Sequence, residues 1–158
     1  MSGSNDVAGL LTDEHRAWIG HEEPPVVVEV SRRDIVKYAI ATEQQLDKYL
    51  LGDEAPLMFI FNLFGPLRQV SELRADGLPR GRNAGPKLPL QRVMAGGVEI
   101  LVQRPIRPGD RLTGVSRIVD MYEKVGRQGP LIFTQRELRV TDAAGAPVLV
   151  EKQTSIAR

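Results

Sequence analysis

Residues 43–49 form a polar stretch whose side chains are the best candidates in this chain for acid–base catalysis. Glu43 and Asp47 are carboxylates, which can abstract or donate a proton as general acid–base groups. Gln44 is a neutral amide and cannot act as a base. Tyr49 can donate a hydrogen bond, but its phenol normally titrates near ~10. Because the stretch contains no histidine, one hypothesis is an unassisted carboxylate base, and the other is a polar turn without catalysis.

Few other residues could form a catalytic or metal site. The chain has no cysteine, which excludes disulfides, thiolate metal sites and a cysteine nucleophile. The two histidines, His15 and His21, both lie near the N-terminus, where we expect them to be solvated or to cap a helix. We therefore predict no metal site and no resident cofactor.

The composition is that of an ordinary globular protein. At 158 residues we expect a flexible N-terminus over 1–11 and a single domain over 12–158. The net charge of +1 and the lack of a basic stripe argue against a nucleic-acid partner. Residues 1–13 show no signal peptide, and the longest apolar run, 55–64, is too short to span a bilayer. The sequence thus predicts a cytoplasmic protein without a membrane partner.

Helices and a strand are predicted around the polar stretch. Thr12 suits the N-cap of a short helix over 12–19. Prolines followed by β-branched residues predict a strand over 24–30. Ser31 can cap a helix that runs to Thr42, with apolar residues spaced i, i+3, i+4 and i+7 on one face. The polar stretch would therefore begin where this helix ends.

A third helix is predicted over 56–64, which is apolar except for one amide. Asp53 or Glu54 can cap it, and Pro56 suits its first turn. A strand is the alternative, but the cap and the proline favour the helix. A helix that is apolar all round should be buried on every side.

The second half of the chain reads as strands. A long irregular segment, 74–90, precedes them. Alternating or β-branched residues mark strands over 98–102, 112–125, 131–141 and 148–156. Short turns between them, including a tight connection at 105–109, predict an antiparallel meander. Helices first and a meander last indicate an α+β domain.

Strand 112–125 carries apolar residues on both faces. One face is predicted to hold Leu112, Ile118 and Tyr122, and the other Val115, Val119 and Met121. Because a one-sided sheet should show one polar face, this pattern indicates that a partner covers the strand.

Four segments resemble, in order, motifs of MaoC-like dehydratases and (R)-specific enoyl-CoA hydratases, including the N-terminal dehydratase half domain of FAS1 type. They are 38–49 (Tyr-Ala-x-x-Ser/Thr-Gly-Asp-x-Asn-Pro-x-His), 55–59 (A-P-P-x-F), 104–112 (R/H-P-x-x-P-G-D-x-L) and 122–130 (Y-E-K-x-G-R-x-G-P-L). The resemblance implies a hot-dog fold, in which an antiparallel sheet of about five strands wraps one central apolar helix.

The catalytic motif of that family is degenerate here. In the family an Asp and a His activate water, and backbone N–H groups at the start of the central helix stabilise the thioester oxyanion. In this chain Gln44 falls at the Asp, Leu46 at the Asn and Tyr49 at the His. Gln44 would then be either a re-purposed polar contact or part of an exposed turn. The only nearby substitutes for the base are Glu43 and Asp47.

The resemblance also implies residues that would contact a coenzyme A thioester substrate. They are Ala55, Pro56, Leu57, Met58, Asn62, Gly96, Gly97, Arg82 and Lys87. For Asn62 the alternatives are an acyl channel or backbone hydrogen bonding. For the two glycines they are an acyl-CoA neighbour or a simple bulge. For Arg82 and Lys87, as for Arg80 and Arg92, they are CoA phosphates or a solvated loop.

Three functions follow from these observations. The first is a non-catalytic subunit of an (R)-type enoyl-CoA hydratase, or 3-hydroxyacyl-CoA dehydratase, that pairs with a homologous chain carrying the dyad and shapes the acyl-CoA pocket. The second is a self-sufficient hydratase with Glu43 or Asp47 as base. The third is a non-enzymatic homodimer that binds acyl-CoA or another small ligand.

Overall fold

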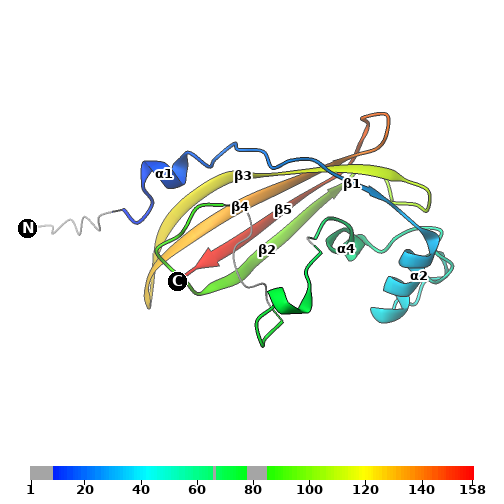
Figure 1. The fold of residues 1–158 in the computed structure, drawn as a ribbon, viewed down its shortest axis with the longest axis horizontal. Coiled ribbons are helices and arrows are strands. Elements are labelled where there is room, and N and C mark those ends of the chain that lie inside the picture. Colours follow the sequence, from blue (N-terminus) through cyan, green and yellow to red (C-terminus); the bar gives the residue numbers. More distant parts are fainter. Residues whose placement is uncertain (1–8, 66, 78–84) are drawn as a thin grey trace, which may run out of the picture.

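A single antiparallel sheet is the framework of the molecule, and the helices gather against it (Figure 1). The structure is a computed structural model that describes residues 9–65, 67–77 and 85–158. Its elements are α1 (Asp13–Arg16), β1 (Val26–Glu29), α2 (Arg32–Ala41), α3 (Asp47–Leu50), η1 (Leu57–Phe59), α4 (Ile60–Phe64), η2 (Val70–Glu72), β2 (Val93–Val102), β3 (Arg111–Gly126), β4 (Gly129–Thr141) and β5 (Pro147–Ala157). The expected α+β order, helices before most strands, is confirmed.

The order of strands in the sheet corrects one prediction. The order is β1-β3-β4-β5-β2, so β3, β4 and β5 form a meander but β2 pairs with β5 and not with β3. The segment 105–109 is therefore no tight hairpin. Hydrogen bonds between Gly109 N–H and Val30 O, and between Val30 N–H and Asp110 O, both 2.8 Å long, hold it beside the end of β1. The chain thus crosses the sheet between β2 and β3.

The predicted caps are confirmed at α2 and wrong at the apolar helix. The side chain of Ser31 accepts a hydrogen bond from Asp34 N–H at 3.0 Å. The apolar helix begins as the 3-10 turn η1 behind Pro56, without a side-chain cap. Asp53 and Glu54 instead pair with basic residues of neighbouring elements. An ion pair with an adjacent element competes for the carboxylate that a cap would need.

Burial of the apolar helix is one-sided, contrary to the prediction. Phe59 and Ile60 are buried, but Leu57, Met58 and Phe61 are 49%, 46% and 39% exposed. The chain's own sheet covers only the first face, which packs with residues of β3, β4 and β5. The apolar residues of the second face are left for another surface to cover.

Close packing between the helix and the sheet depends on one glycine. A Cβ atom at Gly114 of β3 would lie 2.6 Å from the ring of Phe64 of α4. The missing side chain therefore provides the space for that ring. A second cluster fills the other end of the sheet, where Leu11 is buried and its N–H donates to Glu123 Oε1 at 2.6 Å. Packing and this hydrogen bond thus hold Leu11, the last residue of the segment 1–11.

A bulge in β3 explains its apolar pattern and corrects the predicted faces. The register with β4 shifts between Ile118 and Asp120. Because the extra residue reverses the alternation, Ile118 and Met121 lie on the same buried face, while Tyr122 stacks on Phe133 on the other. Apolar residues on both faces of β3 therefore do not by themselves indicate a partner.

One buried carboxyl group lacks compensation. Glu151 of β5 is 6% exposed and lies opposite Leu138 and Ile100. Its Oε1 has no hydrogen-bond partner among the residues that the structure describes. Burial therefore raises the pKa of the Glu151 carboxyl above its ordinary value of 4.5.

We expect Glu151→Gln to stabilise the protein at alkaline pH. A raised folded-state pKa gives wild-type stability that is complete below pH 4.5 and is lost as the pH rises through the folded pKa. At pH 8 the variant should gain about 1–2 kcal/mol in the free energy of unfolding, which urea denaturation measures. At pH 4 the two proteins should agree. Exposed Glu99 gives the control Glu99→Gln, and parallel pH profiles for wild type and Glu151→Gln would contradict the argument.

Candidate functional site

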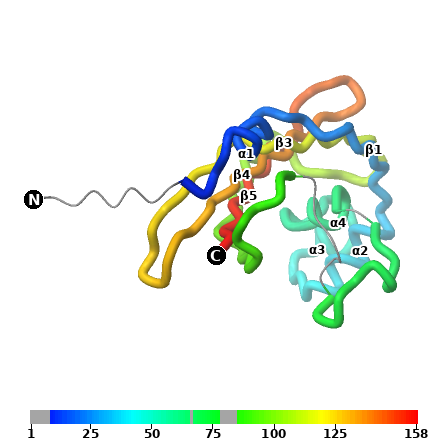
Figure 2. The backbone as a smooth tube through the Cα atoms, turned by 60° about the vertical axis from the view of Figure 1, so that its left-hand side comes forward, coloured from blue at the N-terminus to red at the C-terminus, as the bar shows by residue number. Residues whose placement is uncertain are grey.

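A pocket of about 250 Å³ lies at the start of η1. Its lining includes Tyr49 of α3, the segment 55–57, and residues from the ends of β2 and β5 such as Val102 and Leu149. Figure 2 shows α2, α3 and α4 gathered beside one end of the sheet, so that short helices and strand ends meet there. The pocket therefore brings together four predicted site residues, namely Tyr49, Ala55, Pro56 and Leu57.

Ion pairs and backbone hydrogen bonds hold the wall of this pocket. Lys48 Nζ lies 3.1 Å from Glu54 Oε2, and Arg107 lies 3.7 Å from Glu54 Oε1. The hydrogen bond and charge of Glu54 raise the pKa of Lys48. Ala55 N–H donates to Ile106 O at 2.8 Å, which ties the start of the helix to the β2–β3 crossover. The helix start is thus fixed in place before any ligand binds.

A second ion network supports the crossover behind the pocket. Arg104 lies 2.8 Å from Asp110 and 3.6 Å from Asp142. The hydrogen bond to Asp110 raises the pKa of Arg104. The N–H of Ala146, assisted by that of Ala144 and by Arg104, lowers the pKa of Asp142. These carboxylates are therefore paired with Arg104 within the fold and are not free bases.

The residues of the degenerate motif separate in space. Gln44 Nε2 donates to Thr42 Oγ1 at 3.3 Å, and Gln44 does not line the pocket. Leu46 is 55% exposed. Tyr49 is the one position of the three that reaches the pocket. The structure thus places the His position of the motif at the pocket and the Asp position outside it.

Neither substitute base lines the pocket. Glu43 and Asp47 are exposed. Glu43 has φ of 52°, a left-handed conformation that favours glycine, and the motif it resembles carries glycine at that position. Position 43 thus has a backbone conformation that suits the glycine of the motif, although its side chain differs.

Glu54 is the carboxylate that the pocket does contain, and the sequence did not identify it as a site residue. Its assignment as a helix cap concealed this role. Its position immediately before Ala55 could have indicated that Glu54 belongs to the site. Its partners Lys48 and Arg107, however, become apparent only in the folded chain. Both partners are cations, so two ion pairs hold the Glu54 carboxylate in place.

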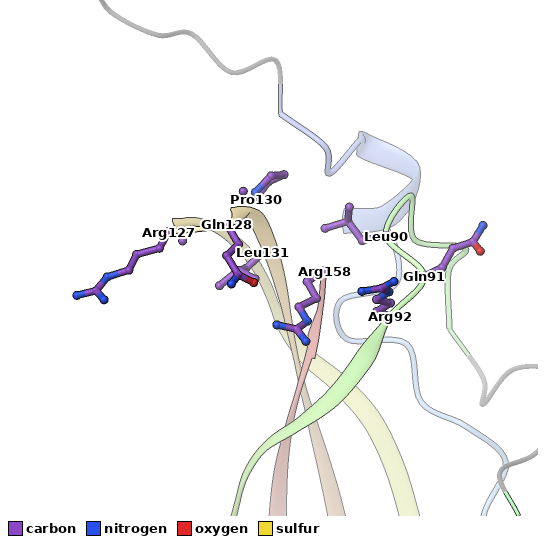
Figure 3. A pocket seen from close by; sticks show the side chains of 10 residues that line it. Leu90, Gln91, Arg92, Arg127, Gln128, Pro130, Leu131 and Arg158 are labelled. Atoms are coloured by element: carbon purple, nitrogen blue, oxygen red, sulfur yellow. The ribbon is translucent and has the colours of Figure 1, made fainter. Parts of the chain in front are cut away.

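The remaining predicted substrate residues lie elsewhere. Met58 and Asn62 are exposed and do not line this pocket. They also do not line a second pocket, which lies beside the start of β2 (Figure 3). The prediction that the apolar helix buries the amide of Asn62 is therefore wrong. Gly96 stands at a bulge of β2, between Ala95 and Gly97, which is the simpler of its two interpretations. Lys87 contributes its carbonyl oxygen to a 2.8 Å contact with His15 Nε2. Arg82 lies outside the described residues.

A comparison with known families identifies the class of this domain. Residues 17–151 match the family described as FAS1-like, dehydratase domain region, and the chain belongs to this family. The resemblance to MaoC-like dehydratases and (R)-hydratases is thereby confirmed.

Known structures share this fold at low sequence identity. The HadBC (3R)-hydroxyacyl-ACP dehydratase complex from Mycobacterium tuberculosis aligns with TM-score 0.64 and 16% identity, over 89% of this chain and 97% of that chain. The ChsH1–ChsH2 complex from the same organism gives 0.62 and 13%, over 86% and 83%. The R-hydratase PhaJ1 from Pseudomonas aeruginosa gives 0.53 and 19%, over 88% and 81%. The hot-dog fold expected from the sequence is confirmed.

Two curated relatives are more similar in sequence. Mesaconyl-C(4)-CoA hydratase of Chloroflexus aurantiacus is 28% identical over 117 residues, which are 74% of this chain but 41% of that protein. A UPF0336 protein of Saccharopolyspora erythraea is 27% identical over 147 residues, 90% of each. The chain thus spans less than half the length of the hydratase. No helix in the described ranges is long and apolar enough to cross a membrane.

Proposed function

We propose that this chain is an accessory hot-dog subunit of an (R)-type enoyl-CoA hydratase or 3-hydroxyacyl-CoA dehydratase. One observation carries the proposal: the pocket at the helix start is formed, but among the described residues its lining has no imidazole and Glu54 as its only carboxylate, which is paired with two cations. General acid–base hydration needs a proton acceptor that is free to accept. The catalytic pair would therefore come from another chain.

Exposed apolar surface supports pairing with that chain. β2 is an edge strand with Val93, Leu101 and Val102 66%, 61% and 43% exposed. A long exposed apolar edge is an aggregation hazard that proteins normally cover. The uncovered face of the apolar helix, with Leu57 and Phe61, adds to this surface. A second hot-dog domain is the partner that this proposal names, and two fold neighbours come from complexes, ChsH1–ChsH2 and HadBC.

The substrate that fits this proposal is a coenzyme A thioester. The curated relative with the hydratase name acts, as that name says, on mesaconyl-C(4)-CoA. In the proposed complex this chain contributes the wall formed by Tyr49 and the segment 55–57, and the partner contributes the acid–base pair.

An affinity purification of the tagged chain from its native host tests the proposal. We expect a stoichiometric second hot-dog chain that carries Asp-x-Asn-Pro-x-His, and hydration of crotonyl-CoA by the mixture at least ~100-fold faster than by this chain alone. Recovery of this chain alone, with no hydration, would favour a ligand-binding homodimer. Hydration by the purified chain that is abolished by Glu43→Ala or Asp47→Ala would favour the self-sufficient enzyme.

A further inference from the structure

Two arginines oppose each other at the end of the sheet, where β2 begins and β5 ends. The N–H of Arg92 donates to Arg158 O at 3.1 Å, and the N–H of Arg158 donates to Arg92 O at 2.9 Å. Such a reciprocal pair belongs to an antiparallel ladder, so its Cα atoms lie about 5.5 Å apart and its side chains leave the same face. Like charges held opposite each other destabilise a sheet. The arrangement therefore needs compensation.

No side-chain carboxylate within the described part of the chain provides that compensation. Arg117, Arg136 and Arg139, further along the same sheet, each pair with a glutamate. Arg92 and Arg158 take part in none of the ion pairs found among the described residues, and neither does Arg127 of the β3–β4 turn. Three guanidinium groups at one end of the sheet are thus without a side-chain counter-charge from this part of the protein.

All three arginines line one pocket of about 820 Å³. Figure 3 shows Arg92 and Arg158 beside each other at the ends of neighbouring strands, while Arg127 extends outward from the turn. The other lining residues are Leu90, Gln91, Gly126, Gln128, Gly129, Pro130 and Leu131. The volume lies in the range of small-molecule sites, and the wall combines apolar side chains with two amides. A ligand that fits would have an anionic group and an organic body.

We propose that this pocket binds the phosphate group of a small organic phosphate ester, with Arg92 and Arg158 as its clamp. A guanidinium presents a planar fork of donors that matches phosphate oxygens, and a dianion can receive both forks at once. A dianion bound between the two guanidinium groups attracts both of them and so offsets their mutual repulsion. Leu90, Pro130 and Leu131 form the apolar wall for the organic body.

This site is distinct from the pocket at the helix start. Arg92 precedes β2, whereas Val102 at the other end of β2 lines the helix-start pocket. Ten residues of strand separate them by about 30 Å. The phosphate site does not depend on the proposed pairing, and the chain alone can be tested for it.

Isothermal titration of the chain with adenosine 3′,5′-bisphosphate, pyrophosphate and adenosine tests the proposal. We expect both phosphate compounds to bind and adenosine not to bind. The double variant Arg92→Gln/Arg158→Gln should bind at least roughly tenfold more weakly. Arg33→Gln, at an exposed arginine of α2, is the matched control and should bind like wild type. If the bisphosphate binds more tightly than pyrophosphate, the apolar wall contacts the organic body of the ligand. If the two bind equally, the site recognises phosphate groups alone.

Thermal unfolding gives a second, independent reading. At equal ionic strength, pyrophosphate should raise the Tm of wild type and of Arg33→Gln, but not that of the double variant. Without ligand the double variant should be at least as stable as wild type, because it loses a like-charge pair. Absence of binding by wild type, or equal binding by wild type and the folded double variant, would overturn the proposal.

Discussion

Phe59→Ala is expected to lower the free energy of unfolding by about 3–5 kcal/mol. Phe59 is fully buried, and its ring packs edge-to-face on Tyr38 with centroids 5.3 Å apart. Removing the ring leaves a cavity between the apolar helix and the sheet that the fixed strands cannot close. Because the free energy of unfolding of a domain is typically about 5–15 kcal/mol, this single change should remove much of it. Urea denaturation of the isolated chain measures it.

Phe61→Ala is the matched control, two residues further along the same helix. Phe61 is 39% exposed, so the same deletion should cost less than about 1.5 kcal/mol in the isolated chain. Equal losses for the two variants would mean that the helix is buried on every side after all. In the presence of a chain that covers this face, the cost of Phe61→Ala should rise.

Leu101→Lys is expected to weaken association through β2 by at least roughly 100-fold, about 3 kcal/mol. Leu101 is 61% exposed on the edge strand, so a lysine there is solvated in the free chain but buried without a counter-charge when another chain covers the strand. Surface plasmon resonance with the recovered partner measures the change. For a self-associating chain, sedimentation equilibrium measures it.

A matched substitution lies on the opposite edge of the sheet. Val27 of β1 is 51% exposed, and Val27→Lys should leave association unchanged. The Tm of both lysine variants should stay close to that of wild type, which separates a lost interface from a lost fold. Association of Leu101→Lys as tight as that of wild type would show that β2 is not the contact surface.

Local signals predicted the elements well. The cap at Ser31 is a hydrogen bond to the third residue of its own helix, so it depends only on neighbours in the sequence. The short turns of the meander are equally local and joined β3, β4 and β5 correctly. The position of β2 was not predictable in this way, because it pairs with residues some fifty positions away that no turn selects.

The wrong predictions about the site also concern contacts between residues that are far apart in the sequence or features that local patterns do not show. Apolar character all round the helix was real, but a sequence does not say whether its own sheet or another surface covers each face. The bulge near Val119 exchanged the two faces of β3 beyond it, which strict alternation cannot anticipate. The opposed arginines at 92 and 158 are far apart in the chain, and only the pairing of β2 with β5 brings them together.

The contact between Gly114 and Phe64 constrains how this family can diverge. Since any Cβ at position 114 would enter the space of the ring, a relative with a larger residue there must carry a smaller one at the position of Phe64. The two positions should therefore covary, and a change at either one alone should be removed by selection because it destabilises the fold. Such a correlated pair would report the docking of the helix on the sheet in sequences whose structures have not been determined.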